Sequence, residues 1–148
     1  MPHAILAAID FSPLSNRVIE IAAGLAERAG APLIVLHAAA PEPDFVGYEV
    51  GPQYVRDQRA GQLRKEHHAL GEIGEALRAR GLDVKVQLQA GPTVETVLAS
   101  AAQADAELIV IGAHRHGRAH RLLLGSVSEG LLRNAPCPVL VVPPEDAA

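Results

Sequence analysis

Four short stretches of the sequence are almost wholly apolar and lack the alternation of a half-exposed strand. They are residues 4–9 (AILAAI), 32–39 (PLIVLHAA), 107–111 (ELIVI) and 139–142 (VLVV). Runs of this kind are typical of strands covered on both faces, as in parallel sheets. Residues 84–88 (VKVQL) alternate instead, which predicts a strand with one exposed side or an edge strand.

Helical patterns fill the intervals between these strands. Ser12 is predicted to cap the first helix, Pro13 to be its first residue and Gly30 to end it. Three further helices are predicted, over residues 53–80, from Thr93 onward and from Ser126 onward. The order β-α-β-α-β-α-β-α-β predicts an α/β fold in which a five-stranded, mainly parallel sheet carries helices on both faces, in three layers (α/β/α).

Length and composition limit the class of protein. The 148 residues suit a single domain over residues 1–148. Aromatic residues make up only 3% and the net charge is −4, so neither the stacking platforms nor the basic stripes of nucleic-acid binding are expected. The start has no basic signal-peptide region, and no apolar run approaches the roughly 18 residues of a membrane span. We therefore predict a cytoplasmic protein that binds neither nucleic acid nor membrane.

The strongest local signal for a ligand lies in residues 112–129 (GAHRHGRAHRLLLGSVSE), between a predicted strand and a predicted helix. A helix N-terminus presents free N–H groups and about half a positive charge. Gly125 would allow the backbone to approach a ligand closely, and Ser126 can donate to an oxygen or cap the helix. Two interpretations stay open, an anion site and a capped helix that follows a solvated basic loop.

The chain resembles the universal stress protein family over almost its whole length. The resemblance rests on residues 5–26 (ILAAIDFSPLSNRVIEIAAGLA), 33–39 (LIVLHAA), and 106–115 with 122–142 (AELIVIGAHR and LLLGSVSEGLLRNAPCPVLVV). It implies a Rossmann-like fold of the adenine nucleotide alpha hydrolase type. It also implies a small stress-response or regulatory protein.

Nucleotide-binding members of that family carry the pattern Gly-x2-Gly-x9-Gly-(Ser/Thr). Gly112 and the pair Gly125-Ser126 match its two ends at the same spacing, while Arg115 stands in place of the second glycine. The resemblance gives Asp10 an acidic role after the first strand, and it turns the backbone of Ala38 toward the adenine. The cofactor-binding residues that it implies are Asp10, Ala38, Gly112, His114, Arg115, Gly125, Ser126 and Val127.

The ligand implied by the resemblance is ATP, or else AMP or ADP, with any Mg²⁺ carried by the phosphates. Three functions stay open. The first is a nucleotide-binding regulatory protein. The second is a dimer that binds no nucleotide and acts through protein–protein contacts, which Arg115 favours. The third is a slow ATP hydrolase, for which the sequence offers no identifiable base or arginine finger.

Residues 139–142 would form an exposed apolar edge strand near the C-terminus, which invites pairing. In the resembled family this strand pairs with its own copy across a two-fold axis. The resemblance therefore implies a homodimer through Val139, Leu140, Val141 and Val142. The alternative is an edge covered by the tail PPEDAA.

No catalytic residue and no metal ligand is predicted. His114, His116 and His120 lack a cysteine or carboxylate at ligand spacing. His37 lies in a buried strand and is interpreted as a core histidine with satisfied nitrogens. Cys137, the only cysteine, is predicted to be a small packing residue.

Overall fold

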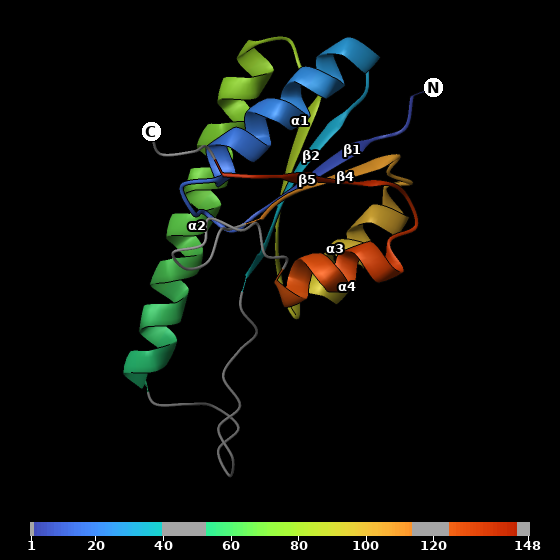
Figure 1. Cartoon of the computed structure of the whole chain (residues 1–148). Helices are drawn as coiled ribbons and strands as arrows, with labels where there is room; N and C mark the ends of the chain where they lie inside the picture. Colours follow the sequence, from blue (N-terminus) through green and yellow to red (C-terminus); the bar gives the residue numbers. More distant parts are fainter. Residues whose placement is uncertain (1, 40–52, 114–124, 145–148) are drawn as a thin grey trace.

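A computed structural model describes residues 2–39, 53–113 and 125–144 of the chain (Figure 1). In these residues strands and helices alternate from the first element to the last. They are β1 (Ile5–Ile9), α1 (Ser15–Ala29), β2 (Leu33–Ala39), α2 (Gln53–Ala79), β3 (Val84–Ala90), α3 (Thr93–Gln103), β4 (Leu108–Gly112), α4 (Ser126–Asn134) and β5 (Val139–Val142). Among the described helices, none combines the length and apolarity needed to cross a bilayer.

The strands form one five-stranded sheet in the order β3-β2-β1-β4-β5. Every pairing in it is parallel. Helices α1 and α2 cover one face, and α3 and α4 cover the other (Figure 1). The predicted five-stranded parallel sheet with helices on both faces is confirmed, and β3 is one of its two edges, as the alternation of residues 84–88 suggested.

The core explains why the strand sequences are apolar throughout. Along β1, Ile5, Ala7 and Ile9 join the core under α1 and α2, whereas Leu6 joins the core under α3 and α4. Both faces of the strand are thus removed from water, so neither can be polar. Leu6 and Ala7 have no exposed surface at all.

The start of α1 differs from the prediction. The helix begins at Ser15 with Leu14 in the N-cap position, and Ser12 and Pro13 lie in the turn before it. The backbone N–H of Ser15 donates to the carbonyl of Ser12, which closes this turn. The prediction that Ser12 caps the helix is therefore wrong, while Gly30 does end it, with φ of 63°.

Strand order reverses at β1, which lies between β2 and β4. From β1 the chain first builds outward through β2 and β3, and later fills the other side with β4 and β5. At such a switch point the connections after neighbouring strands diverge to opposite faces, which leaves a crevice at the carboxyl ends. The candidate site lies in that crevice.

Candidate functional site

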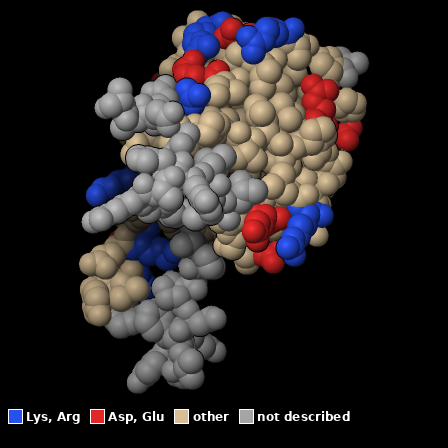
Figure 2. All heavy atoms as spheres, viewed as in Figure 1, with Lys and Arg blue, Asp and Glu red and all other residues tan. Residues whose placement is uncertain are grey.

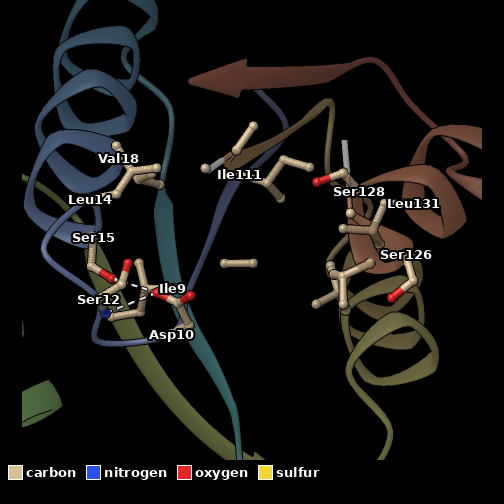
Figure 3. A pocket seen from close by; sticks show the side chains of 16 residues that line it. Ile9, Asp10, Ser12, Leu14, Ser15, Val18, Ile111, Ser126, Ser128 and Leu131 are labelled. Atoms are coloured by element: carbon tan, nitrogen blue, oxygen red, sulfur yellow. Dashed lines mark hydrogen bonds between the residues drawn. The ribbon is translucent and has the colours of Figure 1, made fainter. Parts of the chain in front are cut away.

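A cavity of about 260 Å³ opens at the carboxyl ends of β1 and β4, between α1 on one side and α4 on the other (Figure 3). We call its two sides the α1 wall and the α4 wall. The α1 wall consists of Asp10, Ser12, Leu14, Ser15 and Val18. The α4 wall consists of Gly125, Ser126, Val127, Ser128 and Leu131.

The Asp10 carboxylate stands at the foot of the α1 wall, directly after β1. Its Oδ1 accepts hydrogen bonds from the Ser12 backbone N–H at 2.9 Å and from the Ser15 hydroxyl at 3.2 Å (Figure 3). The first of these bonds forms an Asx turn, a local structure that short acidic side chains favour. The carboxylate is thus oriented by the turn that leads into α1, while Asp10 itself stays exposed.

A second polar group on the α1 wall is the Ser12 hydroxyl. The Ser12 hydroxyl oxygen is buried and has no hydrogen-bond partner within the part of the chain that the structure describes. A buried hydroxyl without a partner costs about 1–3 kcal/mol, so such groups are usually paired. Because Ser12 lines the cavity, a bound molecule could supply the missing partner.

The α4 wall begins with backbone donors. Gly125 is the N-cap of α4, with φ of −76° and ψ of 176°, and no side chain of the described residues caps the helix there. A Cβ built on Gly125 would meet nothing within 4 Å in the described part of the chain, so a side chain would have room there. A helix N-terminus in this state attracts an anion through its free N–H groups and its partial positive charge.

Gly112 ends β4 between the two walls, and its lack of a side chain allows close packing. A Cβ at this position would lie 2.6 Å from Cδ2 of Leu14 and 3.2 Å from Cγ2 of Val18. Both residues belong to the α1 wall, so helix α1 approaches the end of β4 as closely as a glycine permits. The glycine is therefore required by packing at the floor of the cavity.

The cavity brings together several residues that the sequence singled out, namely Asp10, Gly112, Gly125, Ser126 and Val127. Ala38, near the end of β2, is partly exposed and is not among its lining residues. His114 and Arg115 lie outside the described residues. Sequence reasoning missed Ser15 and Ser128 as wall residues, since their place depends on how α1 and α4 are rotated.

His37 is buried, with 8% of its surface exposed, and both ring nitrogens have contacts. Nδ1 lies 3.0 Å from the Ile9 carbonyl oxygen, and Nε2 lies 3.1 Å from Oε2 of Glu66 on α2. The interpretation as a satisfied core histidine is confirmed.

Two further predictions concern metal and thiol chemistry. Within the described ranges there is no group of three or more His, Cys, Asp or Glu that could hold a metal ion. Cys137 is half-buried and packs against the core under α3 and α4. Burial raises the pKa of its thiol, which keeps it protonated near neutral pH. This agrees with a packing residue.

The chain was compared with known families and structures. The profile of the universal stress protein family matches residues 1–143. A universal stress protein of Thermus aquaticus, from the QAH/OAS sulfhydrylase 3' region, is 35% identical over 144 residues, which cover 96% of this chain and 99% of that protein.

Two solved structures share the fold at low sequence identity. The universal stress protein of Archaeoglobus fulgidus in complex with dAMP superposes with a TM-score of 0.69 at 21% identity, over 95% of this chain and 98% of the other. A universal stress protein in complex with cAMP superposes with a TM-score of 0.67 at 23% identity, over 95% of each chain.

Proposed function

Because the chain belongs to the universal stress protein family, we propose that the cavity between α1 and α4 binds an adenine nucleotide. One observation carries the proposal. The uncapped N-terminus of α4 opens onto a cavity whose opposite wall holds a carboxylate, Asp10. A phosphate would be attracted by the first wall and repelled by the second, so its place is at Gly125 and Ser126.

The carboxylate on the α1 wall then faces the uncharged part of the ligand. A carboxylate accepts hydrogen bonds and cannot donate one, so Asp10 suits the hydroxyl groups of a ribose or an amino group. The Ser12 hydroxyl beside it can donate or accept. Each wall also offers an apolar side chain with exposed surface, Leu14 on one and Val127 on the other, which suits the uncharged nucleoside.

The size of the cavity and the bound states of related folds support this choice of ligand. The volume of about 260 Å³ lies near the lower end of the roughly 300–1,000 Å³ typical of small-molecule sites. Two proteins of the same fold bind dAMP and cAMP, both adenine nucleotides. We extend the proposal to ATP and ADP, with Mg²⁺ held by their phosphates rather than by protein ligands.

The proposed role is ligand binding that regulates the protein, without turnover. A nucleotide that binds one conformation or assembly better than another shifts the population toward it. Location in the cytoplasm remains a prediction from the sequence.

The test is to ask whether the purified protein carries and binds an adenine nucleotide. Protein purified from its expression host is denatured, and the supernatant is assayed for adenine nucleotides. Calorimetric titration then compares AMP, cAMP and ATP, the last with and without Mg²⁺. We expect saturable binding of at least one of them. No released nucleotide and no heat at millimolar ligand would reject the proposal and favour a dimer that acts through protein contacts alone.

We further propose that the chain forms a homodimer through β5. The two edges of the sheet differ: β3 carries Lys85, Gln87 and Gln89, whereas β5 is composed of Val139, Leu140, Val141 and Val142. Charged and polar residues protect an edge against pairing, and an apolar edge invites it. To the right of the central grey atoms in Figure 2, the described surface where β5 crosses in Figure 1 is tan, without Lys, Arg, Asp or Glu.

Leu140 is the residue with which to test the dimer, because 37% of its surface is exposed on β5. We expect the parent protein to sediment as a dimer and Leu140→Lys to sediment as a monomer. Leu132→Lys is the matched control, since Leu132 is 45% exposed on α4, outside the proposed contact. A parent protein that stays monomeric at high concentration would reject the proposed dimer.

A further inference from the structure

The residues on either side of Asp10 both contact one side chain, His37 of β2. The Ile9 carbonyl oxygen lies 3.0 Å from Nδ1 of His37, and the Phe11 ring meets the imidazole edge-on, with 4.7 Å between ring centres. Asp10 itself is exposed and belongs to the proposed nucleotide site. The buried imidazole thus contacts the backbone of the residue before the carboxylate and the side chain of the residue after it.

The contact with Ile9 shows that a hydrogen is bound to Nδ1 of the His37 ring. A backbone carbonyl oxygen can only accept, so Nδ1 of His37 carries the hydrogen and donates it. Ile9 and His37 are partners in the β1–β2 pairing, at the last residue of β1. The side chain of His37 therefore continues the hydrogen bonding between the two strands past the end of β1.

The contact with Phe11 explains an unusual backbone conformation. Phe11 has φ of 60°, in the left-handed region that bulky side chains rarely occupy. Such a conformation persists only where the surroundings enforce it, and it is common at functional sites. The aromatic contact between Phe11 and His37 is one such constraint. It directs the chain after Asp10 into the turn that donates Ser12 N–H to the carboxylate.

The other side of the imidazole is held by helix α2. Oε2 of Glu66 lies 3.1 Å from Nε2 of His37, and the two side chains are only 15% and 10% exposed. This oxygen is buried and has no hydrogen bond within the described residues, where its ion-pair contact is with Nε2 of His37. Glu66 in turn fixes the orientation of the ring.

We propose that His37 is a positioning residue of the nucleotide site, which orients the Asp10 carboxylate through Ile9 and Phe11, and that Glu66 holds it in place. This inference rests on the proposed adenine nucleotide site. It assigns a binding role to a buried pair that makes no contact with the cavity. It also makes the affinity for nucleotide depend on how α2 packs against β2.

The first test needs no nucleotide. The hydrogen exchange rate of the Ser12 amide, measured by NMR on the ligand-free protein, reports its bond to Asp10. In His37→Asn the side-chain amide lies near the position of Nδ1 and keeps the donor to Ile9. In His37→Gln it reaches toward Nε2 and Glu66 instead. We expect Ser12 exchange to rise about tenfold in His37→Gln, which loses the contacts with both Ile9 and Phe11, and to rise less in His37→Asn, which loses only the ring contact with Phe11.

The two variants differ in which nitrogen they replace, not in polarity, so a general loss of packing would affect both alike. His68→Gln is the control, because His68 forms a similar contact with Glu72, 2.9 Å apart, on the exposed face of the same helix. It should leave Ser12 exchange unchanged. Exchange at the parent's rate in His37→Gln, or faster exchange in His37→Asn than in His37→Gln, would overturn the inference.

The second test is a double-mutant cycle on AMP affinity, measured by calorimetry. We expect His37→Gln to weaken AMP binding about fivefold to tenfold, and to weaken it no further once Asp10→Ala is present, because its effect passes through Asp10. Additive losses would overturn the inference. A parent protein that binds no adenine nucleotide would reject the proposed function instead, and Ser12 exchange alone would then decide whether His37 positions Asp10.

Discussion

The α1 wall of the cavity has a charged group whose hydrogen bonds are made within the chain, whereas the α4 wall has donors that no side chain caps among residues 2–39, 53–113 and 125–144. On the α1 wall, Ser12 and Ser15 both donate to Asp10. On the α4 wall, Gly125 offers no side chain to the first turn of α4. One wall is therefore ordered before a ligand arrives, and the other is left for the ligand to complete.

The two walls also differ in sign. A carboxylate is negative, and the start of a helix carries about half a positive charge. A molecule that satisfies both must have an anionic end and an uncharged end that donates hydrogen bonds. A nucleotide is such a molecule, and this is why the contrast between the walls indicates more than either wall alone.

The largest expected effect comes from displacing the α1 wall at the floor of the cavity. In Gly112→Ala the new methyl group would meet Leu14 at 2.6 Å. We expect the free energy of unfolding to fall by about 1–3 kcal/mol, as for other overpacked cores. Nucleotide binding should weaken as well, because Leu14 is displaced from the α1 wall. Urea unfolding and calorimetric titration measure the two effects.

Gly71→Ala is the control for that substitution. Gly71 lies within α2, and a Cβ there meets nothing within 4 Å. It should raise the free energy of unfolding by about 0.5–1 kcal/mol, because glycine weakens the middle of a helix. A Gly112→Ala protein as stable as its parent would show that α1 does not approach the end of β4 as closely as described.

The next largest effect is expected from placing a carboxylate on the α4 wall, as Asp10 does on the α1 wall. In Gly125→Asp the new carboxylate would cap α4 and occupy the place of the proposed phosphate. We expect stability to rise by about 0.5–1 kcal/mol and affinity for AMP to fall by roughly tenfold, since capping and phosphate binding compete for the same N–H groups. Thermal unfolding and calorimetry separate the two changes.

Pro92→Asp provides the matched charge at another helix. Pro92 is the N-cap of α3, which also lacks a side-chain cap, and it is not part of the cavity. The same negative charge there should leave AMP affinity unchanged. If Gly125→Asp stabilises the protein and binds AMP as the parent does, the phosphate does not bind at α4.

Much of this contrast could be predicted from the sequence. The apolar runs predicted the parallel sheet, and the family resemblance predicted that Asp10 and Gly112 belong to one ligand site. The start of α1 was missed, because the Asx turn at Asp10 competes with the cap that Ser12 would otherwise form. The sequence offers both options and does not rank them.

The role of His37 could not be predicted for a different reason. Its contact with Ile9 depends on the register of β1 against β2, and two runs that are apolar throughout leave that register open. Its contact with Glu66 depends on how α2 lies along the sheet. These are properties of the packed structure, and no local pattern in the sequence specifies them.

The smallest effect is expected at Ser12. It tests whether the polar groups of the α1 wall all find hydrogen-bond partners before a ligand binds. The Ser12 hydroxyl is buried there without a partner in the described residues. If a nucleotide supplies that partner, Ser12→Ala should weaken AMP binding about threefold to tenfold, which is the contribution of one hydrogen bond. Stability without ligand should stay the same or rise slightly, since no hydrogen bond of this hydroxyl is lost.

Ser100→Ala is the closest control that the chain offers for this substitution. The Ser100 hydroxyl on α3 is likewise buried without a partner in the described part of the chain, but Ser100 does not line the cavity. The two variants should therefore be alike in thermal unfolding and different in calorimetric titration with AMP. If Ser12→Ala binds AMP as tightly as Ser100→Ala does, the α1 wall meets the ligand through Asp10 and not through Ser12.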